Sequence, residues 1–325
     1  MDVPVRDAAT VMLVRDAPAD RASGDAGGLE VFMLRRNLRS DFVGGAYVFP
    51  GGGVDDHDRV TDLEAVCQGR RDADASDQLG VEAGGLAFWV AAIRESFEEA
   101  GVLLAYDGHD GSARGHDGLV RLDDPATIER FAEHRRAVDR GERRLIEVCQ
   151  QEDLRLAVDT MYYFAHWITP EGPTRRYDTR FFVARAPDAQ VPLHDDHEVI
   201  ANLWIRPRDA LAANRAGEFD MIFPTVRTLM AMARFDTADE LMAHAAAIGR
   251  IPGILPRIVA DDGGGVRIVL PGDPGYDELM SAVLPEGLPL SALSGSAVTL
   301  PDGADGPAAT PTSRGGARHA TAESA

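Results

Sequence analysis

The segment RESFEEAGV, residues 94–102, is the most informative part of this sequence. It places three glutamates at spacing i, i+3 and i+4, namely Glu95, Glu98 and Glu99. On a helix that turns by roughly 100° per residue these carboxylates share one face, while Val90, Ile93 and Phe97 share the opposite face. The pattern predicts a helix over residues 85–100 that ends at Gly101, with its apolar side in the core and its acidic side turned outward.

The three carboxylates indicate a cation site. Like charges at this spacing repel, and without a counter-ion each pair weakens a helix by about 0.2–0.5 kcal/mol. Mg²⁺ or Mn²⁺ offsets the repulsion, because hard divalent cations take carboxylate, water and phosphate oxygens as ligands. Charge spacing alone leaves one alternative open, a solvated acidic helix face.

Strands are predicted on both sides of this helix. Residues 8–15 and 29–36 are apolar runs that we expect to pair as a hairpin. A third strand, residues 46–49, leads into Pro50 and three glycines, where proline ends the ladder and glycines permit backbone conformations closed to other residues. We expect this glycine turn to lie close to a ligand.

The remaining pattern alternates strands and helices. Residues 125–160 are predicted to be an inserted helical layer. Further strands are expected at 102–106, 162–168, 180–184 and 199–205, helices at 207–214 and 224–234, and a last hairpin at 254–260 with 266–270. Strands before and after a central helix predict an α/β (α+β) sandwich, folded as one domain over residues 1–290. Residues 291–325 are rich in small, polar and turn residues and are predicted to be a disordered tail.

Charge and composition restrict the partners. With 33 basic and 53 acidic residues the formal net charge is −20, which disfavours polymeric nucleic acid and anionic membranes as partners but allows a small phosphorylated molecule beside a bound cation. Cys67 and Cys149 have no spacing typical of a zinc site or a disulfide framework. No apolar stretch approaches the roughly 20 residues of a membrane span, and a cytoplasmic location is expected. The oligomeric state stays open, with a homodimer as one alternative.

Residues 94–102 resemble the second half of the Nudix box, whose pattern is GX5EX7REUXEEXGU with U apolar, and FPGGGVD at residues 49–55 resembles the strand and loop that open it. If Gly52 is the box glycine, Asp58 stands where the family has its first glutamate. Residues 59–93 number 35 where the family has seven, and Ser96 replaces an apolar residue. The box is therefore split, with residues 59–84 as an insertion.

A split box resembles the peroxisomal coenzyme A diphosphatase branch of the Nudix hydrolases and its bacterial relatives. Residues 34–50, 167–170 and 176–182 resemble that branch too. The resemblance implies a Nudix-type α/β/α sandwich with a mixed sheet and a helical insertion. It also implies a pyrophosphohydrolase that cuts the P–O–P linkage of a nucleoside-diphosphate-linked small molecule, with coenzyme A or acyl-CoA as candidates. Counted back from Gly45, Asp41 stands where the coenzyme A signature of related enzymes has an arginine.

The resemblance also implies roles for individual residues. The metal ligands would be Glu95, Glu98, Glu99 and the carbonyl of Gly52, where bound Mg²⁺ or Mn²⁺ lowers the pKa of a water that attacks phosphorus. The catalytic residues would be Glu98, Glu95, Arg94 and Glu198. Arg94 would orient a neighbouring glutamate, and the general base would come either from the helix or from the acidic loop around Asp195, Asp196 and Glu198. The substrate-binding residues would be Arg36, Gly51, Gly52, Arg176 and Arg180.

Each of these roles has a structural alternative. Residues 194–198 also fit an acidic surface turn with solvated histidines. Arg176 and Asp178 also fit a structural ion pair, and the aromatic residues Trp167, Tyr177 and Phe181 fit the core as well as a stacking surface for a base. For the whole chain the alternative is a non-catalytic Nudix-fold nucleotide-binding or sensor protein. Such a protein is expected to lose the metal glutamates, and all three are present.

Overall fold

A seven-stranded mixed sheet forms the centre of the computed structural model, which describes residues 3–19, 27–38, 44–59, 62–108, 116–193, 199–260, 266–274 and 276–277. The strand order is β3-β2-β1-β8-β7, with β4 also paired to β1 and β9 to β2. The strands are β1 (Val5–Ala17), β2 (Gly28–Arg36), β3 (Tyr47–Val48), β4 (Gly51–Gly53), β7 (Tyr162–Ile168), β8 (Arg176–Arg185) and β9 (Val199–Ile205). Strands β1 and β8 are parallel, and the other pairs are antiparallel.

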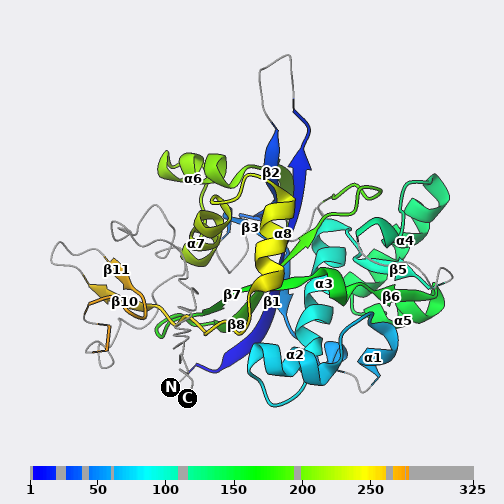
Figure 1. The fold of residues 1–325 in the computed structure, drawn as a ribbon, viewed down its shortest axis with the longest axis horizontal. Helices are drawn as coiled ribbons and strands as arrows, with labels where there is room; N and C mark the ends of the chain where they lie inside the picture. Colours follow the sequence, from blue (N-terminus) through cyan, green and yellow to red (C-terminus); the bar gives the residue numbers. More distant parts are fainter. Residues whose placement is uncertain are drawn as a thin grey trace, which may run out of the picture.

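Helices cover both faces of this sheet (Figure 1). Alternate residues of β1 point to opposite faces: Val11 and Leu13 join the core under α3 (Leu86–Ala100), while Met12 and Val14 join the core under the other helices. Those helices are α6 (Pro207–Arg215), α7 (Phe223–Met232) and α8 (Ala238–Ala247). Each large apolar side chain buried in this way stabilises the fold by about 1.5–3 kcal/mol. The predicted α/β/α sandwich with a mixed sheet is confirmed.

The insertion at residues 59–84 contains two helices, α1 (Leu63–Val66) and α2 (Asp72–Leu79), and α2 caps the start of α3. Asp72 accepts hydrogen bonds from the amides of Gly84 and Leu86, both at 2.9 Å. Ser76 Oγ accepts a third from the amide of Gly85 at 2.9 Å. A helix begins with unpaired N–H groups and a partial positive charge, so a carboxylate here both satisfies the amides and opposes that charge.

A second helical layer covers the outer side of α3. It consists of α4 (Pro125–Asp139) and α5 (Leu145–Gln151), in the segment predicted to be helical, with a two-stranded sheet of β5 (Ala105–Asp107) and β6 (Leu154–Leu156). Here the prediction needs two corrections. The strand expected at 102–106 begins only at Ala105, and the helical prediction for 125–160 is wrong at 154–156, where β6 pairs with β5. Three-residue strands are set by their partners and leave little periodic signal of their own.

The other elements lie close to their predicted positions. Strand β8 begins at Arg176, earlier than expected, because its parallel pairing with β1 extends to Val5. The last hairpin is β10 (Arg257–Ala260) with β11 (Val266–Val269), and α8 was not predicted. Short 3-10 turns occur at η1 (Asp56–Asp58), η2 (His116–Gly118) and η3 (Val158–Thr160). Within the described ranges no helix is long and apolar enough to cross a membrane. Residues 291–325 lie outside those ranges.

Candidate active site

The acidic face of α3 is turned toward the glycine strand β4 rather than outward. Glu99 is buried, and the side chains of Glu95 and Glu98 are only 12% and 14% exposed. The helix ends at Gly101, whose left-handed φ of 67° favours glycine. The open alternative of a solvated acidic face is therefore wrong, because three clustered carboxylates lie in a largely desolvated position.

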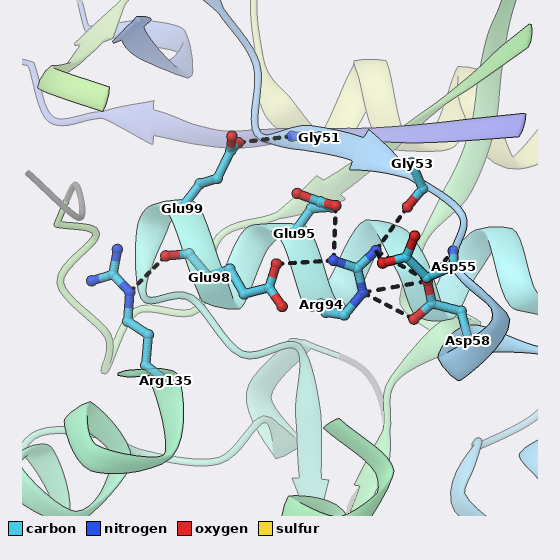
Figure 2. A network of polar contacts seen from close by, with 9 residues as sticks. All are labelled: Gly51, Gly53, Asp55, Asp58, Arg94, Glu95, Glu98, Glu99 and Arg135. Carbon is cyan, nitrogen blue, oxygen red and sulfur yellow. Dashed lines mark hydrogen bonds and ion pairs between the residues drawn. The ribbon is translucent and has the colours of Figure 1, made fainter. Parts of the chain in front are cut away.

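Arg94 is the centre of the polar network that Figure 2 shows. Its Nη1 donates to Glu95 Oε1 at 2.8 Å and to Glu98 Oε2 at 2.9 Å. Its Nε and Nη2 donate to the two carboxylate oxygens of Asp58, each at 3.0 Å, and Nη2 also donates to the carbonyl of Gly53 at 2.7 Å. Burial acts to lower the pKa of Arg94, but Glu95, Asp58 and Glu98 together raise it, so the guanidinium stays charged. One cation thus holds three carboxylates in place.

Asp58 reaches Arg94 from the turn η1. Its side chain is 2% exposed, and its Oδ2 also accepts a hydrogen bond from the amide of Asp55 at 2.9 Å. Asp55 itself lies at the edge of the network: its Oδ2 is 3.8 Å from Arg94 Nη2, and its side chain is 66% exposed. Asp58, which stands where the box pattern has its first glutamate, thus forms a buried ion pair with Arg94.

Gly51 and Gly52 of β4 are required by close approach and not by unusual backbone angles. The prediction of a turn in special conformations is wrong, since residues 51–53 form a strand against β1 and none of them has a positive φ. A Cβ added at Gly52 would lie 2.4 Å from Glu95 Oε1, and one at Gly51 would lie 2.4 Å from Thr10 Oγ1. The amide of Gly51 donates to Glu99 Oε2 at 2.9 Å. The helix and the glycine strand therefore meet at the carboxylates.

Glu98 is a carboxylate whose charged form is disfavoured by burial. Burial raises its pKa from 4.5 to about 8, with Glu95 adding to the increase and Arg94 opposing it. Arg135 of α4 holds the same residue by its backbone, donating from Nε to the Glu98 carbonyl at 2.8 Å. Glu98 is thus held by Arg94 at its carboxylate and by Arg135 at its backbone carbonyl.

The donor set fits a hard divalent cation. All donors are oxygens, and the carboxylates of Asp58, Glu95 and Glu98 share the single positive charge of Arg94. Within the described part of the chain, no three Asp, Glu, His or Cys side chains already converge on one point as metal ligands. Glu95, Glu98 and Glu99 would hold the ion, which when bound lowers the pKa of a water and neutralises phosphate charge.

The predicted substrate-binding arginines lie in different places. Gly52 and Arg180 both pair with Ala9 of β1, so Arg180 lies two strands away from the glycine strand. Its guanidinium contacts Asp178 Oδ2 at 2.9 Å and covers the ring of Phe88 at 4.5 Å. Asp178 also pairs with His166, which the sequence reasoning missed. The structural alternative placed an ion pair between Arg176 and Asp178, and the structure shows Asp178 paired with Arg180.

Arg176 and Arg36 lie on β8 and β2, the two strands on either side of β1. Arg176 begins β8 opposite Val5, and its Nε donates to the carbonyl of Thr169 at 3.2 Å. Arg36 ends β2 and pairs with Val199 of β9, next to the start of β3. Trp167 and Phe181 are buried in the core on the face away from α3, as the structural alternative predicted.

The acidic loop that contains Glu198 lies outside the described residues, together with His194, Asp195, Asp196 and His197. Its neighbours are described. The amide of Leu193 donates to the carbonyl of Ala100 at the end of α3, at 2.8 Å, and Val199 pairs with Arg36. Two further contacts were not predicted from the sequence: Arg135 donates to the Glu98 carbonyl, and Arg59 donates to Asp7. No local pattern links residues this far apart.

Comparisons with known proteins agree with this site. The family description "NUDT19 Nudix domain" matches residues 70–232, a range that contains α3, β7, β8 and β9. The chain is 30% identical to the acyl-coenzyme A diphosphatase NUDT19 of Homo sapiens over 78% of its length and 74% of the relative's. It is 28% identical to the protein of the same name from Gallus gallus, over 84% and 80% of the two chains.

A solved structure supports the fold. The NUDIX hydrolase from Alicyclobacillus acidocaldarius is 24% identical, covers 74% of this chain and 96% of its own, and superposes with a TM-score of 0.57. The chain therefore belongs to the Nudix hydrolases, in the family described as NUDT19 Nudix domain. It is a pyrophosphohydrolase, an enzyme that hydrolyses a diphosphate linkage in a small molecule.

Proposed function

We propose that this enzyme hydrolyses the diphosphate linkage of coenzyme A and acyl-coenzyme A with Mg²⁺ or Mn²⁺ bound at Glu95, Glu98 and Glu99. The observation that carries the proposal is the contact between the acidic face of α3 and β4, in which Glu99 bonds the Gly51 amide and Glu95 lies against Gly52. The substrate class is supported by the two relatives named acyl-coenzyme A diphosphatase and by the split box.

The chain's own groups have separate tasks in this proposal. Glu95, Glu98, Glu99 and the carbonyl of Gly52 bind the ion. Arg94 keeps Glu95 and Glu98 in fixed orientations through its two hydrogen bonds. The diphosphate is bound between β4 and the end of α3, where attack by water on phosphorus breaks one P–O bond and leaves two phosphate monoesters.

Glu198 is proposed as the residue that takes the proton from the attacking water. The support is its place in the chain, one residue before Val199, which pairs with Arg36 at the end of β2. Arg36, Arg176 and Arg180 are proposed as candidates for binding the charged half of the substrate through bidentate contacts.

The test is a hydrolysis panel. Coenzyme A, acyl-CoA, ADP-ribose, NADH and dinucleotides are incubated with Mg²⁺ or Mn²⁺, and phosphate monoesters are separated by chromatography. The proposal expects the highest kcat/KM for coenzyme A or acyl-CoA and none in chelator. Preference for another diphosphate would overturn the substrate class, and metal-dependent hydrolysis of no substrate would favour the non-catalytic alternative.

A further inference from the structure

The two ends of the insertion meet at the side chain of Arg59. Arg59 directly follows Asp58, and Gly84 lies at the other end of the insertion, next to the start of α3. Arg59 Nη1 is 3.4 Å from the position that a Cβ would take at Gly84. The inserted segment therefore leaves the site and returns to it at one place, and a single guanidinium occupies that place.

Arg59 also joins the sheet to α3. Its Nη2 donates to Asp7 Oδ2 on β1, and its guanidinium lies 5.7 Å from the ring centroid of Phe88 in the first turn of α3. Arg180 lies 4.5 Å from the centroid of the same ring and 3.6 Å from Asp7 Oδ1. Arg59, which follows η1, and Arg180 of β8 therefore both contact Phe88 and Asp7.

Because the box is split, the contacts of Arg59 with Asp7 and Phe88 have a role that an unsplit box would not require. In the family's pattern seven residues join the first acidic residue to the arginine, so the chain itself limits their separation. Here 35 residues intervene between Asp58 and Arg94, and a loop of that length places no useful limit on where Asp58 lies. On the side before Asp58 the chain is held by the pairing of β4 with β1 and by the Asp55 amide, which donates to Asp58 Oδ2. On the side after it, the next residue, Arg59, contacts Asp7 of β1.

We propose that Arg59 is a positioning residue for the hydrolysis. By binding Asp7 and packing on Phe88 it fixes the end of η1 against β1 and α3, so that Asp58 meets Arg94 and Arg94 in turn holds Glu95 and Glu98. The proposal rests on diphosphate hydrolysis by this site and not on the choice of coenzyme A as substrate. The ion pair itself adds little to stability, because the Arg59 and Asp7 side chains are 34% and 40% exposed. If the role of Arg59 were only structural, its loss would therefore change Tm slightly and leave kcat unchanged.

The experiment compares Arg59→Met and Arg59→Lys with a matched control, Arg185→Met. Arg185 lies on β8 and pairs with Asp16 at the other end of β1, at 2.9 Å, with a side chain that is 28% exposed. Four quantities are measured on each full-length variant: kcat and KM on the substrate that the wild type hydrolyses best, the Kd of Mn²⁺ by calorimetry, and Tm. Circular dichroism establishes that each variant is folded.

The expected result is a selective loss of rate. Arg59→Met should lower kcat by about fivefold to twentyfold with KM changed less than about twofold, because the carboxylates are misplaced while substrate contacts remain. The Kd of Mn²⁺ should rise by a similar factor. Arg59→Lys should restore most of the loss, Asp7→Asn should reproduce it, and the Asp7→Asn, Arg59→Met double variant should be no worse than the worse single variant.

Three results would overturn the proposal. The first is an Arg59→Met variant with wild-type kcat and Mn²⁺ affinity and a changed Tm only. The second is an equal loss in Arg185→Met, which would make the effect one of general stability. The third is a rise in KM alone, which would make Arg59 a substrate contact. If the wild type hydrolyses no substrate the proposed function fails, while the Mn²⁺ affinities still decide the role of Arg59.

Discussion

Glu99 on α3 accepts a hydrogen bond from the amide of Gly51 on the glycine strand β4, at 2.9 Å. This contact joins two segments that are 48 residues apart and sets the distance between the helix and the strand. Because the donor is a backbone amide, any change that moves β4 also moves a carboxylate of the proposed metal site. The geometry of that site should therefore change when a side chain is added at Gly51 or Gly52.

Substitution of Gly52 tests this sensitivity. We expect Gly52→Ala to lower kcat by about tenfold or more, because the new Cβ would lie 2.4 Å from Glu95 Oε1 and must displace it. The matched control is Gly53→Ala, where the nearest atom to the Cβ is Asp55 Oδ1 at 3.9 Å. Steady-state kinetics at saturating metal measure both, and equal activity of the two variants would contradict the argument from space.

Removal of the charge of Glu98 tests the proposed metal site. We expect Glu98→Gln to lower kcat by about a hundredfold and to weaken Mn²⁺ binding, since an amide is a poorer ligand for a hard cation than a carboxylate. Glu142→Gln is the control, because Glu142 pairs with Arg140 on the surface and its side chain is 56% exposed. Hydrolysis assays and calorimetry are run on both, and a Glu98→Gln variant with full activity would remove Glu98 from the site.

The buried contact between Asp58 and Arg94 should contribute more to stability than the contact between the exposed Asp55 and Arg94. We expect Asp58→Asn to lower the free energy of unfolding by about 1–3 kcal/mol, because a buried charge loses part of its partner. Asp55→Asn should change it by less than about 0.5 kcal/mol, since exposed ion pairs contribute little. Urea denaturation at one pH measures both, and equal effects would show that burial does not decide the strength of this contact.

The pH dependence of stability should report on Glu98 in the metal-free protein. Burial raises the pKa of this carboxyl from 4.5 to about 8 in the fold, so the folded state holds its proton more tightly than the unfolded state. The free energy of unfolding should therefore fall as pH rises from 4.5 to about 8, with no further loss from this group above that range. Urea denaturation in chelator measures it, and Glu98→Gln should show a weaker decline. The same decline in both proteins would assign it to other groups.

The sequence predicts those parts of the fold whose side chains follow a local period. Strands β1 and β2, helix α3 with its end at Gly101, and the last hairpin all have such patterns. Strand β4 was missed as a strand because glycines have low β propensity, and its conformation depends on pairing with residues 8–10 of β1. Strand β6 was missed because its three residues follow a helical pattern and are held by β5.

The candidate site divides in the same way. The carboxylates were found because Glu95, Glu98 and Glu99 lie within five residues of one another on one helix. In contrast, the contact of Arg94 with Asp58 joins positions 36 residues apart, and those of Arg59 with Asp7 and of Arg135 with the Glu98 carbonyl join positions 52 and 37 residues apart. Only the folded chain brings such residues together, so no spacing in the sequence indicates them.

Asp72 and Ser76 of the insertion have a consequence for how this protein can change over evolutionary time. They supply all three acceptors for the amides of residues 84–86. Deletion of this insertion would leave the start of α3 without these acceptors. It would also remove Leu63, Val66 and Cys67 from the core, so the segment that splits the box is itself part of what the fold depends on.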